Sequence, residues 1–277
     1  MDLKRALVVT VALAACSGGR PKSDDTSEPA RKHDAAITAS APLVHDASMR
    51  VAMPTGPYHV VDEPKGDVQV TAVWQDVPLA SRSSAGRTTC GTPRAGAVAP
   101  TVLWGIPEVF VLLAIDHGKA PGDPEVRVTL DHCALVPRVA VAADTIVVTS
   151  AADAPAKLTI TKQGDVHGLD KVAPGGTRAI GLPIAGHSVS VPLEAGGVYQ
   201  IAIEGDPEAS WIISAATPYT SITDPTGHAI LRDVPVGTYG VVAWLPARAG
   251  QPARVAHGEV TVTAGSLGEV TLDLTKP

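Results

Sequence analysis

The sequence predicts an all-β protein, an antiparallel β-sandwich preceded by a disordered tether. From Gly66 onward, short runs alternate apolar and polar residues, which is the pattern of strands that bury one face. Segments rich in glycine and proline, such as APGDP, APGG and DPTG, separate these runs and supply turns. Beyond the N-terminal region no stretch combines a helical period with capping residues. Repeated short strands punctuated by turns favour a sandwich.

The composition permits a packed core and argues against two classes of protein. The chain has 277 residues, enough for one large domain or two small ones. Hydrophobic residues make up 45% and charged residues 18%, which argues against global disorder. The formal net charge is -6 and no basic cluster stands out, so no nucleic-acid partner is expected.

Residues 1–15 have the features of a signal peptide. Lys4 and Arg5 precede an apolar run that is too short to cross a bilayer as a helix. The run ends in Leu-Ala-Ala-Cys, which resembles the bacterial lipobox, and this resemblance implies cleavage before Cys16 and lipidation of Cys16. Ser17 then implies sorting to the outer membrane, so a lipid-anchored protein of the cell envelope is expected. The alternatives are an ordinary export signal with an incidental cysteine, or a cytosolic chain with an apolar start.

Residues 16–64 predict a flexible tether. They are rich in Ser, Pro, Ala and charged residues and show no sustained period. His33, His45 and His59 lie in this segment or at its end. We expect them to be solvated, because tight metal binding needs ligands that converge.

Two cysteines remain if Cys16 is lipidated, namely Cys90 and Cys133. An oxidising compartment favours a disulfide between them. Such a bridge would stabilise the fold by about 3–4 kcal/mol in the chain-entropy model. The alternative is two buried free thiols.

Several segments predict individual strands and turns. The apolar run at 102–115, interrupted by Pro107, predicts a central strand buried on both faces with a bend at the proline. Asp224 to Gly227 predict a tight turn in which Gly227 takes a positive φ. Alternation predicts strands at 68–74, 126–130, 187–193, 199–203, 239–244, 259–263 and 270–274.

Three parts of the chain together resemble a known family. They are TTCGTP at 88–93 with VTLDHCALVPRVAVAADTIVVTSAAD at 128–153, GGVYQIAIEGDPEASW at 196–211, and TPYTSITDPTGHAILRDVPVGTYGVVAW at 217–244. They resemble bacterial exported proteins that combine a cupredoxin-like module with a carboxypeptidase-regulatory-like (transthyretin-type) β-sandwich segment.

The resemblance implies a division of the exported part. A cupredoxin-like β-sandwich is expected over residues 65–214, and a carboxypeptidase-regulatory-like segment over residues 215–277. The first strand, near 67–74, could pair with the C-terminal strands, and this would interleave the two segments. Whether they form one sandwich or two packed domains stays open at this point.

The resemblance also indicates where copper ligands would lie. A blue-copper site needs two imidazoles, a thiolate and usually a weak axial methionine. Here Asp153 and Lys157 occupy the region of the first histidine, and Glu204, Asp206 and Glu208 occupy the region of the remaining ligands. A protonated ammonium cannot bind a cation. We therefore expect no metal and no cofactor, and we interpret the acidic group as a solvated turn rather than a Ca²⁺ loop.

No catalytic set is apparent, so an enzyme is not expected. The sequence lacks a His-Glu-x-x-His motif, a P-loop and a dinucleotide fingerprint. The GHSVS segment at 186–190 lacks the second glycine of a nucleophile elbow. The expected function is a non-catalytic envelope protein that acts by binding or structural presentation towards an unknown protein or glycan. Alternatives are a copper-binding or electron-transfer cupredoxin with unconventional ligands such as His167 and His187, a carbohydrate-binding module, or an enzyme with paired carboxylates.

Overall fold

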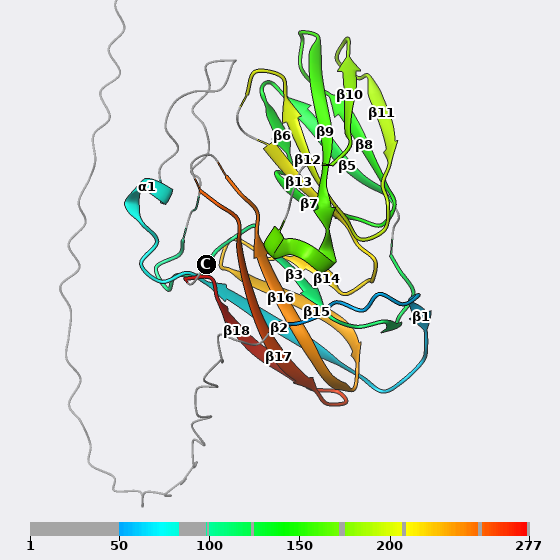
Figure 1. The fold of residues 1–277 in the computed structure, drawn as a ribbon, viewed down its shortest axis with the longest axis vertical. Helices are drawn as coiled ribbons and strands as arrows, with labels where there is room; N and C mark the ends of the chain where they lie inside the picture. The colour runs from blue at the N-terminus through cyan, green and yellow to red at the C-terminus, as the bar shows by residue number, and fades with distance from the viewer. Residues whose placement is uncertain are drawn as a thin grey trace, which may run out of the picture. The chain divides into compact units, whose positions relative to one another are not determined.

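The computed structural model describes residues 50–82, 98, 100–122, 125–171, 175–206, 209–248 and 251–275 (Figure 1). Strands dominate this part of the chain and pair into several sheets, so the predicted all-β sandwich class is confirmed. The only helical elements among these residues are α1 (Leu79–Arg82) and a 3-10 segment, η1 (Val166–Lys171). The described residues all fall within one compact unit, His45–Pro277. The predicted signal peptide, Cys16 and Cys90 lie outside the described residues.

The first sandwich joins strands from both ends of the described chain. Its three-stranded sheet runs β15 (His228–Pro235), β2 (Lys65–Val73), β18 (Leu267–Asp273), and its four-stranded sheet runs β14 (Thr220–Ile222), β3 (Phe110–Leu113), β16 (Gly237–Leu245), β17 (Arg254–Val262). β2 pairs antiparallel with β15 and parallel with β18. The strand predicted near 67–74 is therefore interleaved with the C-terminal strands.

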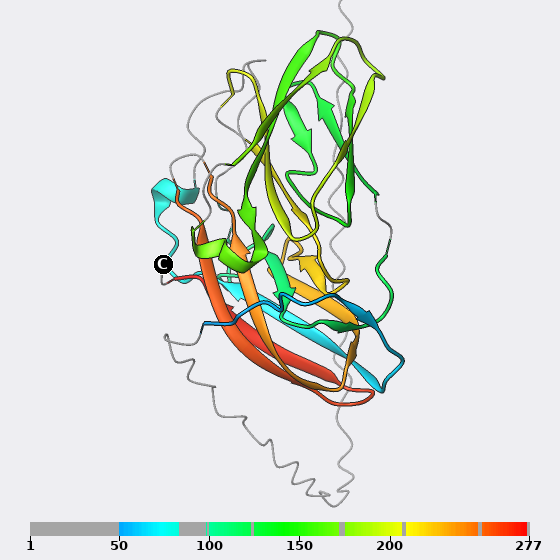
Figure 2. The same ribbon diagram turned by 45° about the vertical axis from the view of Figure 1, so that its right-hand side comes forward.

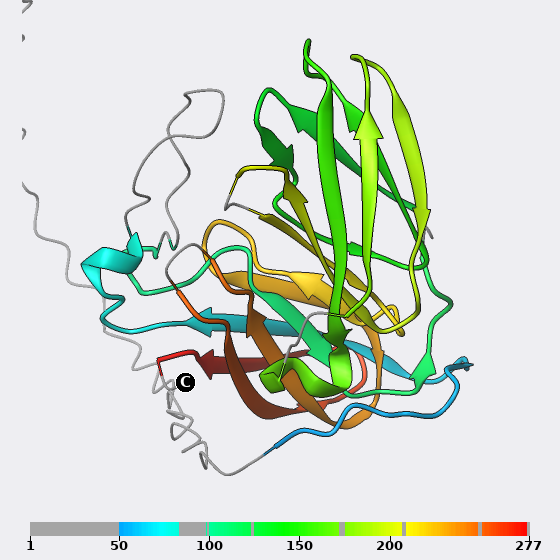
Figure 3. The ribbon, with the colours of Figure 1, turned by 45° about the horizontal axis from the view of Figure 1, so that its top comes forward.

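The chain leaves the first sandwich after β3 and returns to it at β14, and between them it forms a second one, here called the inserted sandwich (Figure 2). One sheet runs β10 (Thr177–Leu182), β9 (Ala156–Asp165), β12 (Gly197–Ile203), β13 (Ala209–Ser214), β7 (Val139–Ala142); the other runs β11 (Ser188–Pro192), β8 (Thr145–Ser150), β5 (Glu125–Asp131), β6 (Ala134–Val136). Figure 3 shows these green and yellow strands rising from the side of the first sandwich where β3 and β14 lie.

This pairing divides the chain differently from the expected modules at 65–214 and 215–277. β2 and β3 precede the inserted sandwich in sequence, yet they pair with strands that follow it. The structure therefore has two packed sandwiches, one inserted into the other. Alternation in a sequence shows which side chains are buried, but it does not show which strand lies beside which. A boundary at residue 214 therefore does not separate the two sandwiches.

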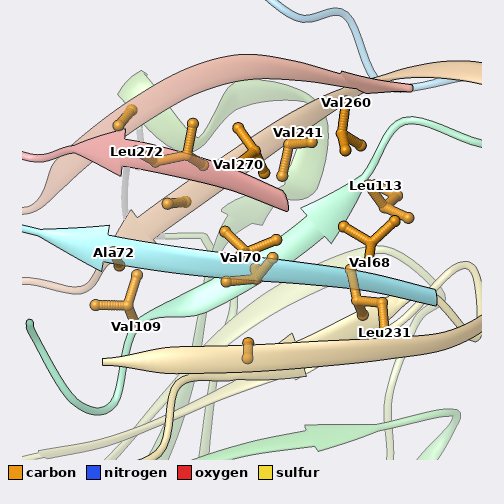
Figure 4. Close-up of a cluster of buried hydrophobic side chains, with 14 of the residues drawn as sticks. Val68, Val70, Ala72, Val109, Leu113, Leu231, Val241, Val260, Val270 and Leu272 are labelled. Atoms are coloured by element: carbon orange, nitrogen blue, oxygen red, sulfur yellow. The ribbon is translucent and has the colours of Figure 1, made fainter. Parts of the chain in front are cut away.

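Each sandwich has its own core. In β2 the buried residues alternate without a break, and Val68, Val70 and Ala72 point between the two sheets (Figure 4). Val241 and Val270 approach them from β16 and β18. The core of the inserted sandwich has the same layout, with these buried side chains at its centre: Val128, Leu130, Ile146, Val148, Leu158, Ile160, Ile201 and Ile212. Burial of each such side chain stabilises the folded state by about 1.5–3 kcal/mol.

A third cluster joins the two sandwiches. Phe110 of β3 and Trp244 of β16 lie on the outer face of the four-stranded sheet, and Trp211 of β13 packs against them from the inserted sandwich. The rings of Phe110 and Trp244 stack with centroids 5.5 Å apart, and Trp211 meets Trp244 edge-on at 5.4 Å. Trp211 Nε1 also donates a hydrogen bond to the carbonyl of Ala247 at 3.1 Å. This apolar junction explains why β16 is buried on both faces over most of its length.

Charged side chains border the same junction. Glu108 Oε2 lies 2.8 Å from Arg248 Nη2 and 3.8 Å from Arg138 Nη1. Arg138 directly precedes β7 of the inserted sandwich, whereas Glu108 and Arg248 belong to the first sandwich. The Arg248 side chain is only 9% exposed, so this pair is screened from water far more than a surface ion pair.

The predicted turn at Asp224 to Gly227 is confirmed. Gly227 has φ +88, and Asp224 Oδ1 accepts hydrogen bonds from the Thr226 backbone N–H at 2.8 Å and hydroxyl at 2.6 Å. A Cβ on Gly227 would lie 2.6 Å from the Gly105 Cα. The turn therefore needs glycine both for its backbone angle and for this close approach.

The predicted central strand at 102–115 is right only in its second half. β3 is fully buried and lies between β14 and β16. Ahead of it, Trp104 and Glu108 take positive φ values of 64 and 60, so the backbone turns on either side of Pro107. Val102 and Leu103 lie in an exposed turn instead of a strand.

The predicted tether also ends earlier than residue 64. β1 (His59–Val60) pairs with β4 (His117–Gly118), and the Tyr58 hydroxyl donates to the carbonyl of Lys119 at 2.8 Å. Burial raises the pKa of Tyr58 strongly, and the nearby Tyr219 raises it further. Val51 packs closely on Gly240 of β16. Residues 50–64 are thus part of the folded unit.

Candidate functional site

A cavity of about 660 Å³ opens at one end of the inserted sandwich. The strand pairing explains its position. β5 and β8 are parallel, so both end on this side, and β12 ends here beside the start of its antiparallel partner β9. The wall consists of residues from these ends and their turns: Leu130, His132, Cys133, Ala151–Lys157, Ile203 and Glu204.

Small residues in the loop between β8 and β9 leave the cavity open. Ala151, Ala152 and Ala154 have side chains that end at Cβ, so they fill little of the space above the strand ends. The loop is held at its start. The Ala151 N–H donates to the Leu130 carbonyl at 2.8 Å, and the Ala152 N–H donates to Ser150 Oγ at 3.2 Å. The space is therefore a consequence of a fixed loop with short side chains.

The wall combines polar and apolar side chains. Lys157 Nζ lies 3.5 Å from Glu204 Oε2, and the Glu204 N–H donates to the Lys157 carbonyl at 2.9 Å. These side chains are 76% and 65% exposed, so their attraction is weak and solvent-screened. His132 pairs with the preceding Asp131, with Nδ1 and Oδ1 2.6 Å apart. Leu130 and Ile203 supply the larger apolar side chains.

The positions that the resemblance assigned to lost copper ligands converge at this cavity. Asp153, Lys157 and Glu204 all belong to its wall. Asp206 is buried in the turn after β12, where its N–H donates to the Ile203 carbonyl at 3.0 Å, and Glu208 lies outside the described residues. Within the part of the chain that the structure describes, no group of three or more His, Cys, Asp or Glu is placed to hold a metal ion.

The two histidines considered as unconventional ligands do not approach each other. His187 directly precedes β11, and its carbonyl accepts from the Ser150 N–H at 2.9 Å, on the cavity side of the sandwich. His167 lies in η1, which follows the far end of β9. β9 runs from the cavity to η1, so the two rings are separated by roughly the length of that strand, on the order of 30 Å.

The structure describes only one of the three cysteines, Cys133. Cys133 belongs to the cavity wall and has an interaction partner. Cys90 lies outside the described residues, so the disulfide between them stays a prediction. The lipidated Cys16 stays a prediction for the same reason.

Comparisons with known proteins assign the chain to no family. No family model, no curated protein and no solved structure matches it. Among the described residues, no helix is long and apolar enough to cross a membrane. The fold and the cavity are therefore the basis for any functional conclusion.

The cavity itself could not be predicted from the sequence. The signal was present as the run Ser-Ala-Ala-Asp-Ala-Pro-Ala at 150–156, a run of small residues that follows an apolar strand. Short side chains are also common in ordinary surface loops. The wall depends on Leu130 and Ile203, which are distant in sequence and come together only through the sheet pairing.

Proposed function

We propose that this protein is a lipid-anchored, non-catalytic component of the bacterial cell envelope, and that its inserted sandwich binds a small ligand in the cavity beside residues 151–157. The observation that carries the proposal is the cavity. Its volume of about 660 Å³ falls within the range of about 300–1,000 Å³ that is usual for small-ligand sites. Its walls combine apolar side chains with a few polar groups, which is also usual for such sites.

The polar groups favour binding over catalysis. Lys157 and Glu204 lie within ion-pair distance of each other, and His132 is paired with Asp131. A general base needs a free acceptor within reach of a substrate proton, and a nucleophile needs an adjacent base. Apolar side chains together with these two pairs and the Asp153 carboxylate suit a ligand that is largely apolar and carries one or two polar groups.

Ligand-observed NMR with a mixture of small aromatic, aliphatic and saccharide fragments tests the binding site. Wild-type protein is expected to attenuate the signals of a subset of fragments. Ala152→Trp, which fills the cavity, should abolish that attenuation. Ala179→Trp adds the same side chain at an exposed position on β10 and should leave binding unchanged. If the same fragments bind the Ala152→Trp variant equally well, the cavity is not the binding site.

The lipid anchor and the export have separate tests. Labelled palmitate should be incorporated by the wild-type chain in a bacterial host, and Cys16→Ser should lose the label and leave the membrane fraction. Mass spectrometry without reduction should find Cys90 joined to Cys133 in the exported protein, because the envelope outside the cytoplasm is oxidising. Labelling that persists in the Cys16→Ser variant would contradict the anchor.

A further inference from the structure

The two most exposed large apolar side chains of the described residues are neighbours. Val102 is 96% exposed and Leu103 is 82% exposed. Both lie in the turn Thr101–Gly105, which we call the apolar tip together with the Trp104 ring. Scattered single apolar residues on a surface are common, but two adjacent side chains with almost no protein contact form a local apolar projection.

The apolar tip is held in place by its own hydrogen bonds. Thr101 Oγ1 accepts from the N–H groups of Leu103 at 3.3 Å and Gly105 at 2.9 Å. The Thr101 carbonyl accepts from the Trp104 N–H at 3.0 Å, and the Trp104 carbonyl accepts from the Trp74 N–H of the first sandwich at 3.0 Å. Trp104 keeps a positive φ of 64, which is strained for a bulky residue. The chain therefore holds Val102 and Leu103 outward at some cost.

The side chains of the apolar tip differ in exposure and chemistry. Val102 and Leu103 are almost fully exposed, the Trp104 side chain is partly buried, and the Arg82 guanidinium lies 5.0 Å from the centre of the Trp104 ring. Aliphatic side chains favour the hydrocarbon region of a bilayer, tryptophan favours its interface, and arginine favours the anionic headgroups. A stable protein interface buries about 800 Å² on each partner, far more than one turn with two apolar side chains supplies.

We propose that the apolar tip inserts into the headgroup region of a phospholipid bilayer and provides a membrane contact separate from the N-terminal lipid. The chain between Cys16 and the folded unit is long enough for both contacts to form at the same membrane. Residues 17–49, at about 3.3–3.6 Å per residue when extended, span at most on the order of 120 Å. A body tethered at Cys16 therefore stays within reach of the same membrane.

The four tryptophans provide a direct readout. Trp74, Trp211 and Trp244 are 2%, 6% and 0% exposed, so their emission should not respond to lipid. Trp104 is the half-buried one and lies in the apolar tip. The unit His45–Pro277 contains every described core residue and lacks the lipid anchor, which makes it suitable for the test. Circular dichroism and a cooperative melt would show that it is folded.

The experiment measures sedimentation with vesicles of phosphatidylethanolamine and phosphatidylglycerol, together with tryptophan emission. The unit should bind vesicles, and its emission should shift to shorter wavelength. Val102→Asp and Leu103→Asp should each weaken binding about tenfold or more, because each removes the burial of one aliphatic side chain and adds a charge. Both positions are exposed, so neither variant is expected to affect folding.

Ile184→Asp is the matched control. Ile184 is 65% exposed but lies on the inserted sandwich, so its replacement should leave vesicle binding unchanged. The proposal is overturned if the folded unit does not bind vesicles, or if the Leu103→Asp variant binds as well as wild type. A surface used for a protein partner would give the first of these results. Fragment binding in the cavity is independent of this outcome, so the two proposals fail separately.

Discussion

Replacing Trp244 by alanine should destabilise the unit by about 3–5 kcal/mol, the usual cost of truncating a buried tryptophan. Trp244 is 0% exposed and lies between Phe110 at 5.5 Å and Trp211 at 5.4 Å. Its side chain buries about 200 Å², which contributes about 5 kcal/mol at about 25 cal/mol per Å². The two aromatic contacts add about 0.5–1.5 kcal/mol each. The space left by the missing indole would partly collapse. This collapse reduces the expected loss of stability to about 3–5 kcal/mol.

Trp244→Phe should be far less costly, and the reason is specific. The Trp244 Nε1–H is buried and has no hydrogen-bond acceptor among the described residues. Leaving such a donor unpaired costs about 1–3 kcal/mol. Phenylalanine keeps the stacking on Phe110 and removes the unpaired donor, so the lost area and the relieved donor largely offset each other. We expect a net change below about 1.5 kcal/mol.

Urea unfolding followed by far-ultraviolet circular dichroism measures both variants. The wild-type protein should unfold in one transition, because the junction around Trp244 joins the cores of both sandwiches. Trp244→Ala should lower the midpoint and separate the transition into two. The reasoning is refuted if the alanine variant loses less than about 1 kcal/mol, or if the phenylalanine variant is as unstable as the alanine variant.

Three further substitutions, one of them with a matched control, test smaller features of the fold. Gly227→Ala should cost about 2 kcal/mol or more in urea unfolding, because its φ is +88 and its Cβ would meet backbone. A hydrogen bond from the Thr226 hydroxyl lowers the pKa of Asp224, so its stabilisation is complete above the unfolded pKa of about 3.9 and is lost as the pH falls through the folded pKa. The stability difference between wild type and Asp224→Ala should therefore be constant near neutral pH and shrink below about pH 4. Glu108→Gln should cost about 1–2 kcal/mol at the sandwich junction, whereas Glu125→Gln, which removes an exposed ion pair, should cost below about 0.5 kcal/mol.

The sequence predicted the strands well where one face of a sheet is buried. β2, β5 and β18 all contain the alternating residues that defined them, because a period of two leaves no other regular structure with a consistent buried face. The prediction was less successful at 102–115, where both faces are apolar. There the buried segment Phe110–Leu113 and the exposed residues Val102 and Leu103 are all apolar, so the sequence does not distinguish them. Only the backbone turns around Pro107 separate them.

The strand order could not be predicted in the same way. β2 and β18 are separated by most of the chain, and nothing local in either strand favours the other as a parallel partner. The choice follows from how the apolar faces match across the whole core, including residues contributed by β16 and β17. This is a property of the assembled sandwich, and no single segment carries it. The insertion after β3 could not be predicted for the same reason. β3 pairs with β16 although the whole inserted sandwich separates the two strands in sequence.

The candidate site combines a location set by the backbone with a chemistry set by side chains. The pairings of β5 with β8 and of β9 with β12 bring Asp153, Lys157 and Glu204 to one cavity whatever side chains these positions carry. An exposed pair such as Lys157 and Glu204 contributes at most about 1 kcal/mol to stability, so its residues can change without loss of the fold. Function can therefore change at this end of the sandwich while the strands stay fixed. The small residues at 151–156 belong to the site for the same reason, since the space that they leave open depends on side-chain size and not on strand pairing.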